Sequence, residues 1–347
     1  MSKQIYVQAQ SDHIESLFKG SALSAIEELV WNALDAEARE VKVDLITNAL
    51  GAVEAVRISD DGTGIDILEA DRTFGNLGGS WKRGKSNDGT GRRLHGRYGR
   101  GRFKAFALGL HVEWRTVVSV GGEKMAYRLS GDASKPGIFN LEAMEGEGNG
   151  ATGTEVYISN VRVSADSLLD AGETVQNLAA RFALYLKSYP DVRIYFNGLP
   201  VTPVIVQKSI SDYSFTLENG QRAKLEIIEW KRKFVGSGRL VLAGPDGFQL
   251  HEQSAGVRTG TGASFTAYLV SPRFPALHAE NQLVMDELNP EVRMHLDQAR
   301  KLIKDHFLSQ DPGKTAFEVE WEDKIGALTK EERKVLLAIL KRSLKTK

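Results

Sequence analysis

The chain has 347 residues, no cysteine, and 45 acidic and 45 basic residues, which gives a formal net charge of zero. A chain of this length is expected to form two domains with separate apolar cores. The lack of cysteine excludes disulfides, thiolate catalysis and cysteine-bound zinc. The balanced charge gives no global signal for nucleic acid, no apolar run reaches membrane-spanning length, and the N-terminus lacks a signal-peptide pattern. We therefore expect a cytoplasmic protein with no membrane partner.

Residues 1–203 mix helical and strand patterns, which predicts a first α/β domain. Residues 1–20 form an N-terminal arm, and Ser21 or Ser24 is expected to cap the next helix, with Glu27 completing a capping box after Ser24. The expected helices are residues 12–18, 25–36, 66–74, 103–110 and 168–189. The expected strands are residues 41–46, 53–59, 111–120, 124–130, 155–159 and 192–196. Residues 75–102 are too polar, and too rich in glycine and arginine, to be core, so they form a long loop.

The segment 200–203, with a proline at each end, marks the boundary to a second α/β domain, residues 204–347. The strands expected there are residues 215–217, 223–230, 238–243 and 264–270. The helices are residues 284–308 and 329–344, and the first of them is expected to continue through Pro290.

The helix over residues 25–36 carries an unusual polar stripe. It is apolar nearly all round and should be buried, yet Glu28, Asn32 and Asp35 are spaced i, i+4 and i+7 and share one narrow face. Buried carboxylates and amides are costly unless they form hydrogen bonds, pair or bind a ligand. The stripe therefore predicts a polar cavity.

Three further motifs follow this helix in order. The string DDGTG, residues 60–64, ends a strand with Asp60 and then places glycines at 62 and 64. In GRYGRGRFKAF, glycines at 96, 99 and 101 precede an apolar helix, and Gly153 with Thr154 enters the strand GTEVYI. Four motifs in this order are more specific than any one of them.

A different motif, GSWKRGKS at residues 79–86, matches the phosphate-loop pattern G-x-x-x-x-G-K-S. A true phosphate loop needs a buried strand before it and a helix after it, and this string has neither. A basic loop that can touch phosphate through Lys82 or Lys85 is the better interpretation.

The four motifs resemble those of the GHKL ATPases, the superfamily of gyrase-B, heat-shock chaperone, histidine-kinase and MutL proteins. EELVWNALDAEA resembles the MutL and chaperone version, and GRYGRGRFKAFALG resembles the chaperone or MORC version. The resemblance covers roughly residues 1–200. It implies an α/β sandwich of the Bergerat type over residues 1–203, with residues 75–102 as an ATP lid, followed by a transducer-like α/β domain over residues 204–347. We expect no dimerisation, nuclease or DNA-cleaving module within residues 204–347.

The resemblance also assigns roles to the helical stripe. Glu28 would be the general base that deprotonates the attacking water. Asn32 would be the main protein ligand of a Mg²⁺ ion otherwise held by phosphates and water. Asp35 would support the nucleotide pocket near the base.

Other motif residues would bind the rest of ATP. Asp60 would accept a hydrogen bond from the adenine amino group, helped by Thr154, while Gly62 and Gly64 would let the backbone pass close to the purine. Gly99 and Gly101 would offer backbone N–H groups to the phosphates. Further ATP-binding candidates are Lys82, Gly96, Arg97, Tyr98, Arg100, Arg102 and Lys104. A basic residue of the second domain would complete the site, with Arg258 as the first candidate and Lys231 or Lys233 as the second.

Each of these residues also has a purely structural interpretation. Glu28 and Asn32 can be a satisfied pair in a buried helix, Asp60 can begin a turn, and Thr154 can be an ordinary strand residue. Gly99 and Gly101 can mark the entry to a helix. The basic run 82–104 can be a solvated loop or can meet a nucleic-acid backbone.

The function implied by the resemblance is ATP binding and slow hydrolysis to ADP and phosphate, used as a conformational switch. Lid closure and ATP-dependent homodimerisation would accompany it, with residues 1–20 as an exchange arm and DNA or a protein as a further partner. One alternative is a nucleotide-gated clamp or recruitment module with negligible turnover. A histidine kinase core is disfavoured, because no phospho-accepting helix with a recognisable histidine precedes residues 25–36.

Overall fold

The computed structural model describes residues 18–66, 101–144, 150–232, 238–257, 259, 262–284 and 289–310, with the single residues 329, 332 and 335. The chain forms two compact units, residues 1–205 and residues 206–347. The helices predicted over residues 12–18, 66–74 and 329–344 lie wholly or almost wholly outside the described residues.

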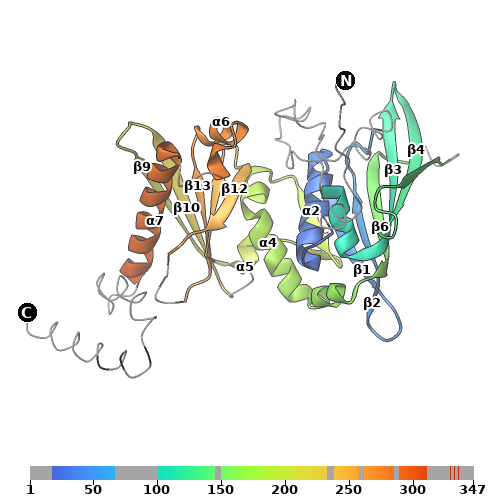
Figure 1. The fold of residues 1–347 in the computed structure, drawn as a ribbon, viewed down its shortest axis with the longest axis horizontal. Coiled ribbons are helices and arrows are strands. Elements are labelled where there is room, and N and C mark those ends of the chain that lie inside the picture. Colours follow the sequence, from blue (N-terminus) through green and yellow to red (C-terminus); the bar gives the residue numbers. More distant parts are fainter. Residues whose placement is uncertain are drawn as a thin grey trace, which may run out of the picture. The chain divides into compact units, whose positions relative to one another are not determined.

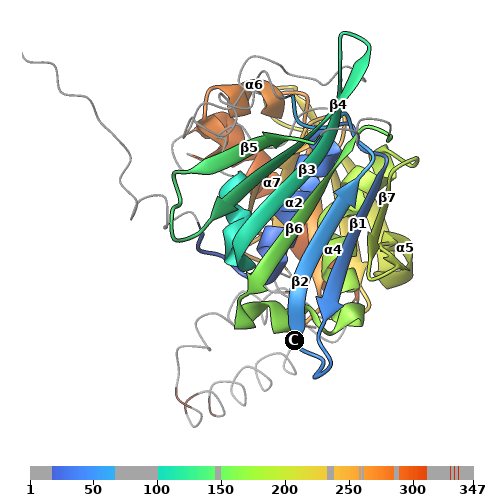
Figure 2. The ribbon, with the colours of Figure 1, turned by 90° about the vertical axis from the view of Figure 1, so that its right-hand side faces the viewer.

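The first unit is built on an eight-stranded sheet with the strand order β5-β4-β3-β6-β2-β1-β7-β8 (Figure 1, Figure 2). The strands are β1 (Glu40–Thr47), β2 (Val53–Asp60), β3 (Gly109–Val120), β4 (Glu123–Asp132), β5 (Phe139–Ala143), β6 (Gly153–Val161), β7 (Arg193–Phe196) and β8 (Leu199–Pro200). Neighbouring strands are antiparallel except β1 and β7, which are parallel.

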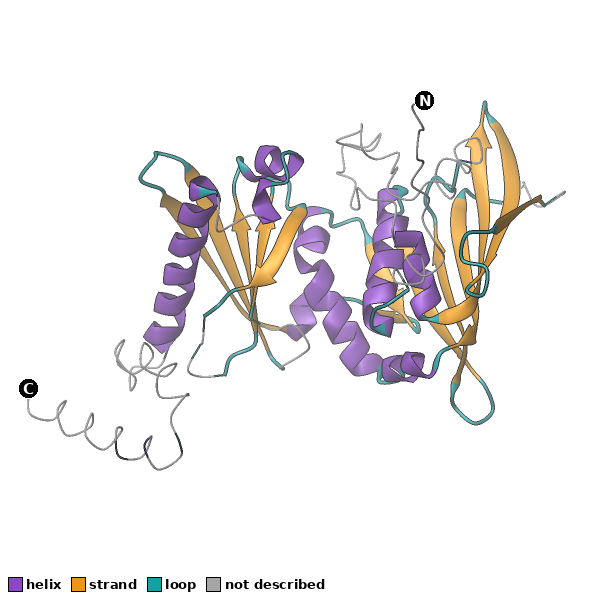
Figure 3. Ribbon diagram, in the orientation of Figure 1, coloured by secondary structure: helices purple, strands orange, loops and turns teal. Residues whose placement is uncertain are grey.

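Helices cover one face of this sheet (Figure 3). They are α2 (Ala22–Asp35), the 3₁₀ helices η3 (Gly101–Ala107) and η4 (Val163–Leu168), and α4 (Ala171–Ser188). Along β3, Trp114 and Val118 are buried, whereas Glu113 and Arg115 lie on the opposite face and form an ion pair of 2.6 Å. This alternation buries one face and leaves a charged one, so the predicted two-layer α/β sandwich is confirmed.

Helix α2 lies at the centre of the helical layer and contacts η3, η4, α4, β1 and β2. Its Trp31 ring lies 4.9 Å from Phe182 and 5.2 Å from Tyr185, centroid to centroid. Ser21 caps the helix by accepting a hydrogen bond from the Ser24 amide at 3.1 Å. The predicted alternative of a capping box from Ser24 to Glu27 is wrong, because the helix already begins at Ala22; Glu27 instead lies 3.5 Å from Arg181.

Two expectations for the middle of the sheet differ from the structure. The helix predicted over residues 103–110 is a 3₁₀ helix that ends at Ala107, and β3 starts at Gly109. A Cβ on Gly109 would lie 2.5 Å from the Ser159 carbonyl, so the close approach of β3 to β6 begins at this glycine. Strand β5 was not predicted, although Phe139, Leu141 and Ala143 alternate with polar residues; it is a five-residue edge strand with mostly exposed side chains.

The second unit is a five-stranded sheet with the order β12-β11-β13-β10-β9. Its strands are β9 (Gln207–Thr216), β10 (Arg222–Trp230), β11 (Arg239–Ala243), β12 (Gln249–Ser254) and β13 (Phe265–Val270). Its helices are α6 (Phe274–Ala279), η5 (Gln282–Val284) and α7 (Pro290–Gln310), and α5 (Pro203–Val206) spans the boundary between the units. Strand β12 and helix α6 are additions to the predicted elements.

Helix α7 packs its apolar stripe, including Leu296 and Ile303, onto the sheet core around Leu225. It starts at Pro290 rather than continuing through it, as the sequence had suggested. The Asn289 side chain accepts hydrogen bonds from the amides of Glu291 at 2.9 Å and Val292 at 3.1 Å. A proline in the first helical position has no amide to leave unpaired, which explains why the helix begins there.

Candidate functional site

The polar stripe of α2 lies on the helix as the sequence predicted. Glu28 and Asn32 are partly exposed, and Asp35, the last residue of the helix, is only 6% exposed. The helix therefore holds two accessible polar side chains and one buried carboxylate on a single face.

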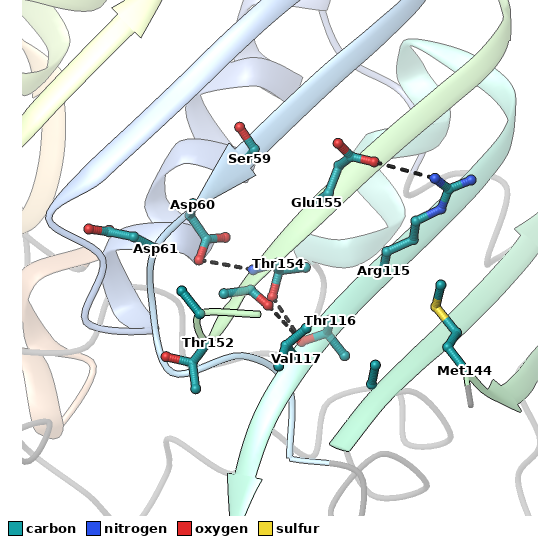
Figure 4. Close-up of a pocket in the computed structure, with 13 residues that line it drawn as sticks. Ser59, Asp60, Asp61, Arg115, Thr116, Val117, Met144, Thr152, Thr154 and Glu155 are labelled. Atoms are coloured by element: carbon teal, nitrogen blue, oxygen red, sulfur yellow. Dashed lines mark hydrogen bonds and ion pairs between the residues drawn. The ribbon is translucent and has the colours of Figure 1, made fainter. Parts of the chain in front are cut away.

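Asp60 is the last residue of β2 and lies opposite Thr154 on β6. Its Oδ1 accepts a hydrogen bond from the Gly62 amide at 2.9 Å. It also accepts one from the Thr154 amide at 3.3 Å (Figure 4). Within the described ranges no group donates a hydrogen bond to Oδ2. The described residues thus fix the carboxylate through one oxygen and leave the other as an acceptor.

The surroundings of Asp60 perturb its ionisation. Burial raises the pKa of its carboxyl from 3.8 to about 6, and the negative charge of Asp61 adds to the rise. The hydrogen bonds from Gly62 and Thr154 pull in the opposite direction, since they stabilise the carboxylate, but they are the weaker effect. Asp60 is therefore ionised at neutral pH and titrates in the weakly acidic range.

The neighbouring Asp61 has a structural task. Its Oδ1 accepts hydrogen bonds from the amides of Arg39 at 2.7 Å and Glu40 at 2.8 Å. These amides follow the end of α2, where the chain turns into β1. Sequence reasoning missed this role, because nothing local distinguishes the two aspartates.

The glycines of this region provide close backbone approaches. A Cβ on Gly62 would lie 2.4 Å from the Ala36 carbonyl oxygen, and one on Gly64, where φ is +81°, would lie 2.3 Å from that of Val117. The Thr63 amide donates a hydrogen bond of 2.7 Å to the Ala36 carbonyl. The two glycines therefore let the DDGTG segment pack closely against the end of α2 and against β3. The sequence had predicted that they bring the backbone close to a purine, and it did not predict these contacts within the protein.

Thr116 on β3 is a further polar residue of the cluster, and sequence reasoning missed it. Its side chain is 2% exposed. Its Oγ1 accepts a hydrogen bond from the Ile65 amide at 2.8 Å, donates one to the Gly153 carbonyl at 3.1 Å, and lies 3.2 Å from the Thr154 hydroxyl. Only the register between β3 and β6, which places Thr116 opposite Thr154, brings these groups together.

A hollow of about 310 Å³ opens beside these residues. We call it the Asp60 hollow; its lining includes Asp60, Thr116, Gly153, Thr154, Arg115 and Glu155 (Figure 4). Arg115 and Glu155 form an ion pair of 3.8 Å at one side. The side chains of Arg115 and Glu155 lie on the charged face of the sheet. The pairing of Asp60 with Thr154, and of Thr154 with Thr116, places those three side chains on the other face, which the helices cover. The residues that line the hollow do not include Glu28, Asn32 or Asp35, so the hollow is not the space between the α2 stripe and Asp60.

Several predicted binding residues lie outside the described residues, namely Lys82, Lys85, Gly96, Arg97, Tyr98, Gly99, Arg100, Lys233 and Arg258. The same applies to most of the predicted lid and N-terminal arm. Gly101 and Arg102 begin η3. The Lys104 ammonium donates a hydrogen bond of 2.9 Å to the Lys19 carbonyl, close to the start of α2.

Residues 21–136 match a family model described as "Histidine kinase-, DNA gyrase B-, and HSP90-like ATPase". The match supports the GHKL superfamily, which the four motifs resemble. The match includes the α2 stripe, the DDGTG segment and Thr116, whereas Thr154 lies beyond its end. No curated protein matches the chain. Among the helices of the described ranges, none is long and apolar enough to cross a membrane.

Proposed function

We propose that the protein binds ATP with its adenine amino group on Asp60 and hydrolyses it slowly to ADP and phosphate. The observation that carries the proposal is the Asp60 carboxylate, which is fixed through Oδ1, while none of the described residues donates a hydrogen bond to Oδ2. Its side chain lies on the helix-covered face of the sheet, beside Thr154, and within the residues that match the ATPase family model. An acceptor placed in this way favours a base that carries an amino group over one that lacks the donor.

The α2 stripe would supply the chemistry. Glu28 would take a proton from water as the water oxygen bonds to the γ-phosphorus and the bond from phosphorus to the β,γ-bridging oxygen breaks. The partly exposed Asn32 amide is a ligand type that suits Mg²⁺, which would enter with the phosphates and neutralise their charge. Asp35 would support the pocket wall from the end of the helix. Backbone amides at Gly99 and Gly101 would hold the phosphates, and Arg258 would complete the site.

Nucleotide binding would act as a switch. Residues 75–102 would close over ATP, and two copies of the chain would pair through their N-terminal regions, with residues 1–20 as the exchange arm. The second unit would act as the transducer, and DNA or a protein would be the further partner.

The decisive experiment compares phosphate release and ATP binding for wild type, Glu28→Gln and Glu27→Gln. Loss of the general base should lower turnover by about 10² to 10⁴ and leave binding intact. Glu27 contacts Arg181 rather than the proposed nucleotide, so its variant serves as the matched control and should keep near-normal turnover. Binding without phosphate release by wild type would favour the gated clamp, and absence of binding would overturn the proposal.

The switch has its own test. Size measurement with and without the β,γ-imido analogue of ATP, repeated with DNA, should show a dimer that depends on the nucleotide. An unchanged size in every condition would contradict the proposed switch.

A further inference from the structure

The Thr116 hydroxyl has three polar neighbours and a single hydrogen to give. The Ile65 amide can only donate to it, and the Gly153 carbonyl can only accept from it. The third neighbour, the Thr154 hydroxyl at 3.2 Å, can act in either sense. A hydroxyl offers one hydrogen and two lone pairs, so one arrangement satisfies all three contacts.

In that arrangement Thr116 donates to Gly153 and accepts from both Ile65 and Thr154. The reverse sense between the two threonines would leave the oxygens of Thr116 and Gly153 facing each other at 3.1 Å without a hydrogen between them. Thr116 is 2% exposed, so water cannot easily repair such a contact. The hydrogen of Thr154 is therefore committed to Thr116.

This commitment determines which groups Asp60 and Thr154 offer to a ligand on the helix-covered face of the sheet. With its hydrogen turned toward Thr116, the Thr154 oxygen offers only lone pairs to a ligand. Asp60, bonded across the strand pair to the Thr154 amide, offers Oδ2, to which no described group donates. The two side chains thus present acceptors, and a ligand edge rich in donors is the chemical complement.

We propose that Thr116 is a specificity-determining residue, which holds Thr154 as an acceptor and thereby makes the pair of Asp60 and Thr154 select a purine with an amino group at position 6 over one with a carbonyl group. This inference rests on the proposed function, since it concerns how the same site reads its base. An exocyclic amino group, as in adenine, donates its hydrogens to the two acceptors. A carbonyl oxygen in the same place, as in guanine or hypoxanthine, has no hydrogen to donate, so its lone pairs are repelled by those of Asp60 and Thr154.

Removal of the Thr116 hydroxyl should change the base selectivity of Asp60 and Thr154 as well as the stability of the fold. In Thr116→Val, a near-isosteric change, the Thr154 hydroxyl loses its acceptor and can turn its hydrogen toward a ligand carbonyl. Thr116→Ser keeps the hydroxyl and is the matched control. If Thr116 were only a structural link, Val would lower the melting temperature but leave the ratio of the two nucleotide affinities unchanged.

The experiment measures binding of the β,γ-imido analogues of ATP and GTP to the full chain by calorimetry, with thermal unfolding recorded for each variant. Wild type should prefer the ATP analogue by about 10² or more, and Thr116→Val should reduce that preference by about tenfold. Thr116→Ser should keep the wild-type preference for the ATP analogue. An unchanged ratio in a folded Thr116→Val protein would overturn the inference while leaving the proposed function standing.

If Thr116→Val does not fold, the same binding experiment is done with Thr154→Val. This variant removes the Thr154 acceptor and leaves the hydrogen bonds of Thr116 with Ile65 and Gly153 in place. It should weaken the ATP analogue by about tenfold and so reduce the preference, and an unchanged preference would overturn the inference. Absence of binding by wild type would instead overturn the proposed function, and the inference with it.

Discussion

Asp60 and Asp61 are consecutive in the chain, but their carboxylates bind different parts of the domain. Asp60 accepts from the amides of Gly62 and Thr154, and Asp61 accepts from the amides of Arg39 and Glu40. The second pair ties the DDGTG segment to the turn that follows α2, the helix that carries Glu28 and Asn32. The proposed base-binding and catalytic residues are thus held on one framework.

Asp60→Asn should stabilise the unliganded fold while abolishing nucleotide binding. Asparagine keeps an oxygen for the amides of Gly62 and Thr154 but carries no charge. Because the pKa of Asp60 is raised from 3.8 to about 6, its ionised form destabilises the fold, by up to about 3 kcal/mol at neutral pH. The free energy of unfolding of wild type should therefore fall, through this group, as pH rises from about 4 to 6.

Denaturant unfolding of wild type and Asp60→Asn at about pH 4 and pH 7 measures this effect. The variant should gain most at pH 7, where the wild-type carboxyl is charged in both states. Calorimetry with an ATP analogue should find no binding, because the new amide group of asparagine would face the adenine amino group. A variant that is less stable at pH 7, or that still binds, would contradict the assignment.

Asp61→Ala should destabilise the first unit. The amides of Arg39 and Glu40 would each lose a hydrogen bond to a charged acceptor, at a cost of about 1–3 kcal/mol in the free energy of unfolding. Asp61→Asn keeps the acceptor oxygen and should recover most of the loss. Chemical denaturation of the two variants checks the effect, and equal stability of Ala and Asn would count against a hydrogen-bonding role.

The α2 stripe and the strand that ends at DDGTG could be predicted, because each depends on spacing within a short window, and the sandwich was implied by the resemblance of the four motifs to the GHKL ATPases. Thr116 and Asp61 could not be recognised in this way. Thr116 acquires its role only when β3 pairs with β6, and Asp61 only when the end of α2 returns to the end of β2. Both depend on contacts between residues far apart in the chain. Strand β5 was missed for another reason, since it is only five residues long and lies exposed at the edge of the sheet.

Gly64→Ala and Gly51→Ala form a matched pair that separates backbone conformation from crowding. Both glycines have positive φ, +81° and +82°. Nothing lies within 4 Å of a Cβ at Gly51, whereas one at Gly64 would lie 2.3 Å from the Val117 carbonyl oxygen. Gly51→Ala should lower the free energy of unfolding by about 1 kcal/mol, the cost of the left-handed conformation alone. Gly64→Ala should cost at least about twice as much and should also weaken ATP binding. Equal losses in thermal unfolding would show that the contact with β3 relaxes.

Glu229 should control the acid stability of the second unit. It is 1% exposed on β10 and accepts hydrogen bonds from Gln310 at 2.6 Å, Lys208 at 2.9 Å and Ser209 at 3.0 Å. His306 on α7 lies 3.2 Å away and also contacts the Tyr213 hydroxyl at 2.7 Å. Burial by itself raises the pKa of Glu229, but these hydrogen bonds outweigh it and hold the pKa at about 2, below the ordinary 4.5.

A lowered pKa in the folded state means that the ionised Glu229 stabilises the fold above pH 4.5 and that this stability is lost as pH falls from 4.5 toward 2. Glu229→Gln should remove that pH dependence and lower the free energy of unfolding at neutral pH by about 1–3 kcal/mol, since Lys208 and His306 lose a charged partner. The exposed Glu218, in the turn between β9 and β10, provides the control variant Glu218→Gln, which should leave stability nearly unchanged. Urea unfolding of the three proteins between about pH 2 and 7 tests the network, and a Glu229→Gln curve parallel to that of wild type would rule out an ionised carboxylate at its centre.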